Sequence, residues 1–144
     1  MAEKTAQSFA NHLRWDPPFH FFALPVLLIT FIASIVYAVR FPSLMSGWAV
    51  VFFAALFLVG LKARLYALKV QDRVIRLEER LRLATLAPGM RGRIEELSEP
   101  QLIGLRFACD AEAPALAERA LKEKLACGDI KKAVVSWRAD YWRA

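Results

Sequence analysis

His20 is the side chain in this sequence whose type and position best fit a chemical role, namely cofactor ligation. It stands among Phe19, Phe21 and Phe22 at the start of a long apolar stretch. A histidine at membrane depth can serve as an axial ligand of haem or of a magnesium-centred pigment such as (bacterio)chlorophyll. Near the membrane interface the same imidazole can instead hydrogen-bond water or lipid headgroups. Ligation is therefore one of two interpretations, and the sequence predicts no cofactor.

The two cysteines and the carboxylates form no recognisable catalytic or metal-binding pattern. Cys109 and Cys127 have no second cysteine or histidine at the spacing of a zinc site, and the cytoplasmic side expected for them disfavours a disulfide. The sequence has no Gly-x-Ser-x-Gly, phosphate-loop, dinucleotide or His-Glu-x-x-His pattern. Carboxylates stand beside basic residues on expected helix surfaces, as Glu118 does with Lys122. We therefore predict neither an enzyme nor a metal site.

The elements that carry these residues follow from an uneven distribution of charge. Hydrophobic residues make up 57% of the 144 residues, and Arg40 is the only charged residue between Pro17 and Leu61. Residues 17–39 and 43–61 are each close to the ~20 residues that cross ~30 Å of hydrocarbon. Between them, Pro42 beside Arg40 is typical of a tight turn. We predict an integral membrane helical hairpin of two transmembrane helices, preceded by an N-terminal segment over residues 1–16.

The basic residues that follow the second span predict its orientation. Lys62, Arg64, Lys69 and Arg73 come directly after it, whereas the turn offers only Arg40. Because Lys and Arg near span ends stay in the cytoplasm, both termini should be cytoplasmic. The same four side chains are placed to meet anionic phospholipid headgroups. This segment accounts for much of the net charge of +6, and no nucleic-acid-binding motif accompanies it, so nucleic acid is not an expected partner.

Small side chains mark the faces on which the two spans should pack. Thr30, Ser34 and Ala38 recur every four residues on the first span, and Ser43 and Gly47 begin the second. Small residues let helix backbones approach closely in lipid, where the hydrophobic effect does not drive association. We expect these residues to pack within the hairpin, with a dimer seam as the alternative. The remaining apolar faces are left for lipid or for other membrane subunits.

The second span is expected to continue as a cytoplasmic helical extension over residues 62–87, because no helix breaker separates Leu61 from Ala87. Apolar residues recur in it at alternating spacings of four and three, as in a coiled-coil seam. The seam residues are Val70, Val74, Leu77 and Leu81. In a parallel pair, Arg73 and Glu78 would form a favourable flanking pair. Two partners for the seam stay open: a second copy, giving a homodimer, and the chain's own C-terminal helices.

Residues 88–144 are predicted to form a small cytoplasmic helical tail, because short amphipathic stretches alternate there with helix stop signals. Ser98 and Gln101 fit a capping box that begins a helix ending near Cys109. Gly128 should end the next helix, and Asp129 should cap the last one. That last helix would carry a face for a partner or for self-association, made of Ile130, Val134, Trp137 and Tyr141. The predicted fold class is all-α.

Two segments of the chain carry distinctive combinations of aromatic, basic and acidic residues. The first is Asn-His-Leu-Arg-Trp-Asp-Pro-Pro-Phe-His-Phe-Phe at residues 11–22. The second lies within residues 129–143 and holds Asp-Ile-Lys-Lys-Ala and Trp-Arg-Ala-Asp-Tyr-Trp-Arg. In these segments the chain resembles a family of small bacterial membrane proteins of unknown function. The resemblance spans nearly the whole chain and implies two spans, a cytoplasmic helical tail and a multi-pass protein of the bacterial inner membrane, with no assigned activity. Because both segments flank the membrane on its cytoplasmic side, we predict that they contact each other.

Together these features predict a non-enzymatic accessory subunit of a larger bacterial membrane complex, bound to other integral membrane subunits. Respiratory and photosynthetic assemblies are candidate hosts by analogy. Two alternatives stay open. One is a self-associating membrane scaffold or regulator that binds anionic lipid through the basic helix, and the other is a haem- or pigment-binding subunit that uses His20.

Overall fold

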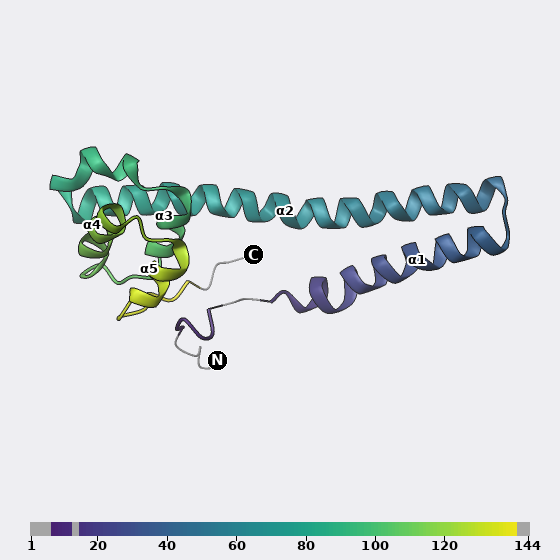
Figure 1. The fold of residues 1–144 in the computed structure, drawn as a ribbon, viewed down its shortest axis with the longest axis horizontal. Helices are drawn as coiled ribbons and strands as arrows, with labels where there is room; N and C mark the ends of the chain where they lie inside the picture. Colours follow the sequence, from purple (N-terminus) through teal and green to yellow (C-terminus); the bar gives the residue numbers. More distant parts are fainter. Residues whose placement is uncertain (1–6, 13–14, 141–144) are drawn as a thin grey trace. The chain divides into compact units, whose positions relative to one another are not determined.

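The structure is a computed structural model that describes residues 7–12 and 15–140. Over these residues it is all-α, with no strand (Figure 1). A single isolated antiparallel bridge among them joins Ala108 to Trp137. The chain divides into two compact units. We call the unit of Trp15–Lys69 the hairpin, and the unit of Met1–Arg14 with Val70–Ala144 the head. The long helix α2, Leu44–Leu86, contributes residues to both units.

The hairpin begins with a π-helical turn, Pro18–Ala23, which runs into α1, Leu24–Arg40. Pro25 lies in the first turn of α1 and has no backbone N–H to donate, which accounts for a change of helix type at this point. No side chain caps the start of the π turn; instead the Asp16 carbonyl accepts the N–H of His20 at 2.9 Å. Both α1 with its π turn and α2 are long and apolar enough to cross a membrane.

The turn between the spans lies where the sequence predicts it, and two serines organise it. The Ser43 N–H donates to Ser46 Oγ at 2.9 Å, and the Ser46 N–H donates to Ser43 Oγ at 3.0 Å. Ser46 Oγ also donates to the Phe41 carbonyl at 3.0 Å. These bonds satisfy backbone groups that are otherwise unpaired at the end of one helix and the start of the next. Ser43 therefore acts in the turn rather than on a helix-packing face.

The packing residues predicted on α1 lie on its less exposed side. Ser34 is buried, Thr30 and Ala38 are half-buried, and Phe31 stacks on Phe57 of α2 with ring centroids 6.3 Å apart. Gly47 does not join this contact, because it is exposed and has open space beside its Cα.

The close approach of the spans is at another glycine, Gly60, where an added Cβ would come within 2.9 Å of Leu27 Cδ1. The expectation for Gly47 is corrected accordingly. A small residue in a span predicts a close contact only if the helix face it occupies meets another helix.

The head packs short helices against the C-terminal part of α2. They are a 3₁₀ segment, Pro88–Glu96, and the helices α3, Glu99–Leu105, α4, Ala113–Glu123, and α5, Cys127–Ala133. The core is apolar and fully enclosed at its largest members, Leu83, Leu102, Leu105, Phe107 and Ile130. The capping box of Ser98 and Gln101 is confirmed at the start of α3.

The ends of the head helices differ from the sequence-based expectation. α3 stops at Leu105 instead of near Cys109. α4 ends at Glu123 with Lys124 in the left-handed conformation, φ 52°, a position where glycine is the usual residue. Gly128 lies inside α5, whose N-cap is Ala126 and not Asp129.

A tertiary contact accounts for the shifted end of α4. The Gln101 side-chain amide donates to the carbonyls of Ala120 and Leu125, and so satisfies the end of α4 from outside the helix. A glycine stop signal no longer predicts where a helix ends when a side chain from a distant part of the sequence caps that helix.

The last predicted face also changes role. Ile130 and Val134 are buried in the core of the head, and α5 ends before Val134, so Trp137 lies in an extended segment that pairs with Ala108. Tyr141 lies outside the described residues. The predicted partner face on the last helix is therefore corrected for Ile130, Val134 and Trp137: their apolar surface is used to close the chain's own head.

Candidate functional site

The part of α2 that lies in the head has two opposite faces. One face carries Ile75, Glu79 and Leu83, which are 6%, 3% and 0% exposed, and Leu83 belongs to the core of the head. The other carries the predicted seam, which we call the α2 stripe. Its members Val70, Val74, Leu77 and Leu81 are 63%, 48%, 60% and 63% exposed. The chain's own C-terminal helices therefore pack on the opposite side of α2 and leave the stripe uncovered by the described residues.

The residues that flank the α2 stripe are charged. Arg73 and Glu78 are both exposed, and neither makes an ion pair with a described residue. Arg76, which is half-buried, pairs with Glu99 of α3 through Nη1 and Oε2 at 3.2 Å. The stripe is thus an apolar strip with one basic and one acidic side chain available beside it.

The predicted headgroup-binding residues lie along α2 before the stripe. Lys62 and Lys69 are exposed, and the Lys62 ammonium lies 5.9 Å from the centroid of the Tyr66 ring. Arg64 is half-buried, with its guanidinium 5.9 Å from the Phe19 ring. Phospholipid binding by these residues, and by Arg73 beyond them, remains a prediction.

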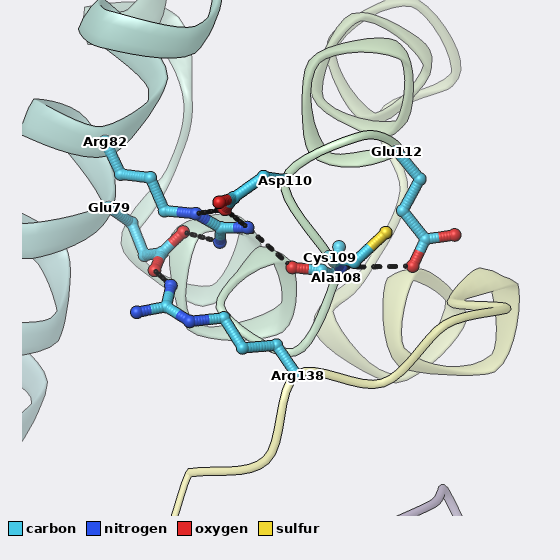
Figure 2. Close-up of polar contacts among 7 residues, drawn as sticks. All are labelled: Glu79, Arg82, Ala108, Cys109, Asp110, Glu112 and Arg138. Atoms are coloured by element: carbon cyan, nitrogen blue, oxygen red, sulfur yellow. Dashed lines mark hydrogen bonds and ion pairs between the residues drawn. The ribbon is translucent and has the colours of Figure 1, made fainter.

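Behind the stripe, Glu79 is the centre of a polar network that holds three segments of the head together (Figure 2). Its carboxylate accepts from Arg82 Nη1 at 2.9 Å and from Arg138 Nη1 at 3.3 Å. Arg82 also donates from Nε to Asp110 Oδ1 at 2.8 Å and from Nη2 to the Ala108 carbonyl at 2.7 Å. Each contact on Arg82 is charge-assisted, so the network fixes the segments at Ala108 and at Arg138 against α2.

Burial raises the pKa of Glu79, and the neighbouring guanidiniums of Arg82 and Arg138 oppose that rise. The network borders a groove of about 690 Å³, which Arg106 and Asp140 also line. In that groove the carboxylates lie beside arginines: Arg106 Nη1 is 3.5 Å from Asp140 Oδ2. The arrangement neutralises buried charge and orders the chain, which are the properties of a structural network.

Sequence reasoning missed this network, although one signal was present. Glu79 stands between Ile75 and Leu83 on the face of α2 that becomes buried. A carboxylate at a position with apolar residues four before and four after it indicates a buried ion pair, because an uncompensated charge there would be too costly.

A second carboxylate, Glu112, acts on the backbone around Cys109. Its Oε1 accepts the N–H groups of Cys109 and Ser136 at 3.3 and 3.2 Å, and its Oε2 accepts that of Val135 at 3.2 Å. Together with the Cys109 N–H to Ser136 carbonyl bond of 3.0 Å, these contacts join the loop before α4 to the segment after α5. Cys109 and Cys127 are half-buried free thiols.

Residues 7–12 pack on the rest of the head, so the predicted contact between the two segments that carry the family resemblance is present at His12. The His12 ring lies 5.8 Å from the ring of Phe107 and 5.9 Å from that of Trp137. Its Nε2 is 3.3 Å from Lys131 Nζ, and its Nδ1 is 2.7 Å from the Phe9 carbonyl. A proton on Nδ1 therefore leaves Nε2 as the acceptor for the ammonium.

A two-point hydrogen bond closes the same contact. The Gln7 amide donates to the Asp140 carbonyl at 3.1 Å and accepts the Asp140 N–H at 2.8 Å. We call this pair of bonds the terminal clasp. It pairs both backbone polar groups of Asp140 with a side chain 133 residues away.

His20, the candidate ligand, is half-buried between two aromatic rings of the hairpin. Its ring makes edge contacts with Trp15 and Phe19 at centroid distances of 5.1 and 5.2 Å. Its Nδ1 lies 2.9 Å from the Asp16 carbonyl and 3.2 Å from the Asp16 amide nitrogen. The described residues contain no group of three or more His, Cys, Asp or Glu placed to hold a metal ion. Ligation through His20 stays a prediction.

Comparison with known proteins identifies a family for the chain. No curated protein and no solved structure matches the chain. A family of unknown function (DUF6526) matches it over residues 1–144, from the N-terminal segment through the hairpin to the end of the head. The chain belongs to this family.

Proposed function

We propose that this protein is a non-enzymatic accessory subunit of a larger membrane complex in the bacterial inner membrane. The hairpin lies in the bilayer, and the head stands at the cytoplasmic surface, where it contacts other subunits. The single observation that carries the proposal is the continuity of α2: one helix of 43 residues holds both an apolar span and the face on which the head folds. The head is thereby tied to the membrane without a linker.

The hairpin supports the proposal through its exposed surface. Among its described residues only Ser34 and Ser46 are buried, while large apolar side chains such as Ile29, Val39 and Leu58 are more than half exposed. A water-soluble protein rarely exposes apolar surface on this scale. Lipid or the spans of other subunits would cover it, and neither requires polar residues on these faces.

The clasped head supports an arrangement in which both ends of the hairpin lie on one side of the membrane. Residues 7–12 and residues 107–140 contact each other within the head, and both apolar helices lie between them in the sequence. A chain whose flanking segments meet must cross the bilayer an even number of times, and two crossings satisfy this. The basic residues Lys62, Lys69 and Arg73 favour the cytoplasmic side.

Native sizing after gentle extraction tests the proposal. The tagged chain is extracted from membranes in a mild detergent, sized under native conditions, and the co-purifying chains are identified by mass spectrometry. We expect a particle well above twice the 16.3 kDa of one chain, with defined membrane subunits in it. A harsher detergent, used as the matched control, should release the chain. A monomer or an isolated homodimer at every detergent strength would refute the accessory-subunit function.

A further inference from the structure

We propose that the α2 stripe is covered by the α2 stripe of a second copy of this chain, in a parallel two-stranded coiled coil. The inference rests on the part of the proposed function that places the hairpin in a membrane, and it does not depend on any other subunit. Its starting point is the surface itself: four large apolar side chains, 48–63% exposed, on a helix that already packs the head on its opposite face.

The spacing of the stripe fits a heptad seam. Val70, Val74, Leu77 and Leu81 are separated by four, three and four residues. In heptad notation Val74 and Leu81 occupy a positions, and Val70 and Leu77 occupy d positions. At the centre of the seam, Val74 at a and Leu77 at d form the combination that favours two strands, whereas Val70 at d and Leu81 at a add no such preference. The seam geometry therefore matches one further α-helix with the same repeat.

Charge identifies that helix as a second copy of α2. Arg73 occupies the g position before Val74, and Glu78 occupies the e position after Leu77. In a parallel coiled coil, a g residue lies beside the e residue of the next heptad on the partner. Arg73 of each copy therefore meets Glu78 of the other, and two-fold symmetry makes the pair twice. Both side chains are exposed and lack an ion pair to a described residue of their own chain.

The membrane provides the parallel direction. Two copies inserted with the same topology direct α2 the same way across the bilayer, so an antiparallel pair of the same helices is excluded by their anchors. Anchoring also confines both copies to one surface, which raises the effective concentration of one stripe for the other. A short seam that would be weak between soluble helices can then be populated.

Cysteine crosslinking in native membranes tests the pair. Cys109 and Cys127 are first replaced by alanine, and single cysteines are placed by Val70→Cys, Val74→Cys, Leu77→Cys and Leu81→Cys. Lys69→Cys is the matched control, because Lys69 is exposed on the same helix at a c position outside the seam. Under mild oxidation we expect a product of twice 16.3 kDa from the stripe variants, and at least about fivefold less from the control.

Charge reversal separates this pair from other occupants of the stripe. In the Leu77→Cys background, Arg73→Glu places like charges together twice and should lower the dimer yield about fivefold, as should Glu78→Arg. The double variant Arg73→Glu/Glu78→Arg restores the pairs with their signs exchanged and should restore the yield. Lipid or a different protein on the stripe would show no such restoration.

The outcomes divide cleanly. Equal crosslinking at Lys69 and along the stripe, crosslinks from the stripe only to a chain of another mass, or a double variant as poor as the singles would each overturn the inference. Native sizing that finds no larger particle while stripe crosslinks persist would refute the accessory-subunit function and leave the homodimer standing. The two proposals therefore fail separately.

Discussion

The hairpin and the head share the helix α2, yet the helix buries different kinds of side chain in the two units. In the head, α2 contributes Leu83 to a core in which the large apolar side chains are fully enclosed. In the hairpin, the same helix buries a small polar residue, Ser46, and leaves Trp48, Val51 and Leu58 exposed. Helical periodicity is the same in both parts, so the difference lies in what covers the apolar faces: the core of the head in one part, and no described residue over these three side chains in the other.

The comparison shows what stabilises each unit. Removal of apolar surface from water contributes roughly 25 cal/mol per Å², and this is the main favourable term for the head. The hairpin has almost no such burial, and in lipid its helices associate through close contacts such as those at Gly60 and Phe31. Removing a large apolar side chain should therefore destabilise the head strongly and the hairpin little.

The largest expected effect is the loss of an aromatic side chain from the core of the head. Phe107 is fully buried, so Phe107→Ala should destabilise the head by about 3–5 kcal/mol. Phe21→Ala, at a hairpin residue that is 69% exposed, is the matched control and should leave the head unchanged. Hydrogen exchange of head amides in detergent measures both variants. Equal loss of protection in the two would mean that the units do not differ in this way.

A pair of glycine substitutions sharpens the comparison between close and open packing. A Cβ at Gly104 would meet Ile130 Cβ and Cγ2 at 3.1 Å and the Cys127 carbonyl oxygen at 3.2 Å, so Gly104→Ala should cost about 1–3 kcal/mol. Gly128 lies in α5 with open space around it, and Gly128→Ala should stabilise by about 0.5–1 kcal/mol. Urea unfolding midpoints provide the measurement. A neutral Gly104→Ala would show that α3 and α5 can separate at no cost.

Glu79 makes the stability of the head depend on pH in a defined direction. Its pKa is raised above 4.5 in the folded state by burial, so the folded protein binds this proton more tightly than the unfolded chain. The free energy of unfolding should therefore fall as pH rises from about 4.5, and level off above the folded pKa.

Glu79→Gln isolates that contribution. The variant cannot ionise at this position, so its unfolding midpoint should lack the fall that the native protein shows, although it loses on the order of 1–2 kcal/mol near neutral pH from weakened bonds to Arg82 and Arg138. Urea unfolding midpoints of both proteins between pH 4 and pH 7 measure this difference. Parallel pH profiles for the two proteins would assign the dependence to other groups.

The smallest expected effect is at the terminal clasp. Gln7→Ala removes two hydrogen bonds to Asp140, both partly exposed, and should cost about 0.5–1.5 kcal/mol. The loss should be seen as faster proteolysis of the N-terminal segment, with the core amides of the head unaffected. A Gln7→Glu variant keeps the acceptor for the Asp140 N–H and should fall between the two.

The sequence was sufficient to predict the two apolar helices, the turn between them and the capping box, but not which residues pack against each helix face. Charge depletion between Pro17 and Leu61 and the proline at 42 predicted the two apolar helices and the turn, because hydropathy and helix breaking are local properties. The absence of a breaker after Leu61 predicted the continuation of α2. The capping box at Ser98 was likewise readable, since both of its members lie within one turn.

The features that the sequence did not predict depend on contacts between residues that are far apart in the chain. Helical spacing showed an apolar seam on α2, but it did not tell whether the chain's own C-terminal helices or a second copy would cover it. The Glu79 network needs Arg138, which is 59 residues away, and the end of α4 depends on Gln101. Ile130 and Val134 were placed on an exposed face for the same reason: periodicity identifies an apolar side, and only tertiary packing decides what lies against it.

The terminal clasp has a consequence for how the protein is made. Gln7 leaves the ribosome long before Asp140, so residues 7–12 have no docking surface during most of translation. Closing so long a loop is costly unless the chain has already been folded back on itself, which the paired spans accomplish. In the proposed membrane arrangement, biogenesis is thereby ordered: the two apolar helices insert first, and residues 7–12 close onto their docking surface as the last step.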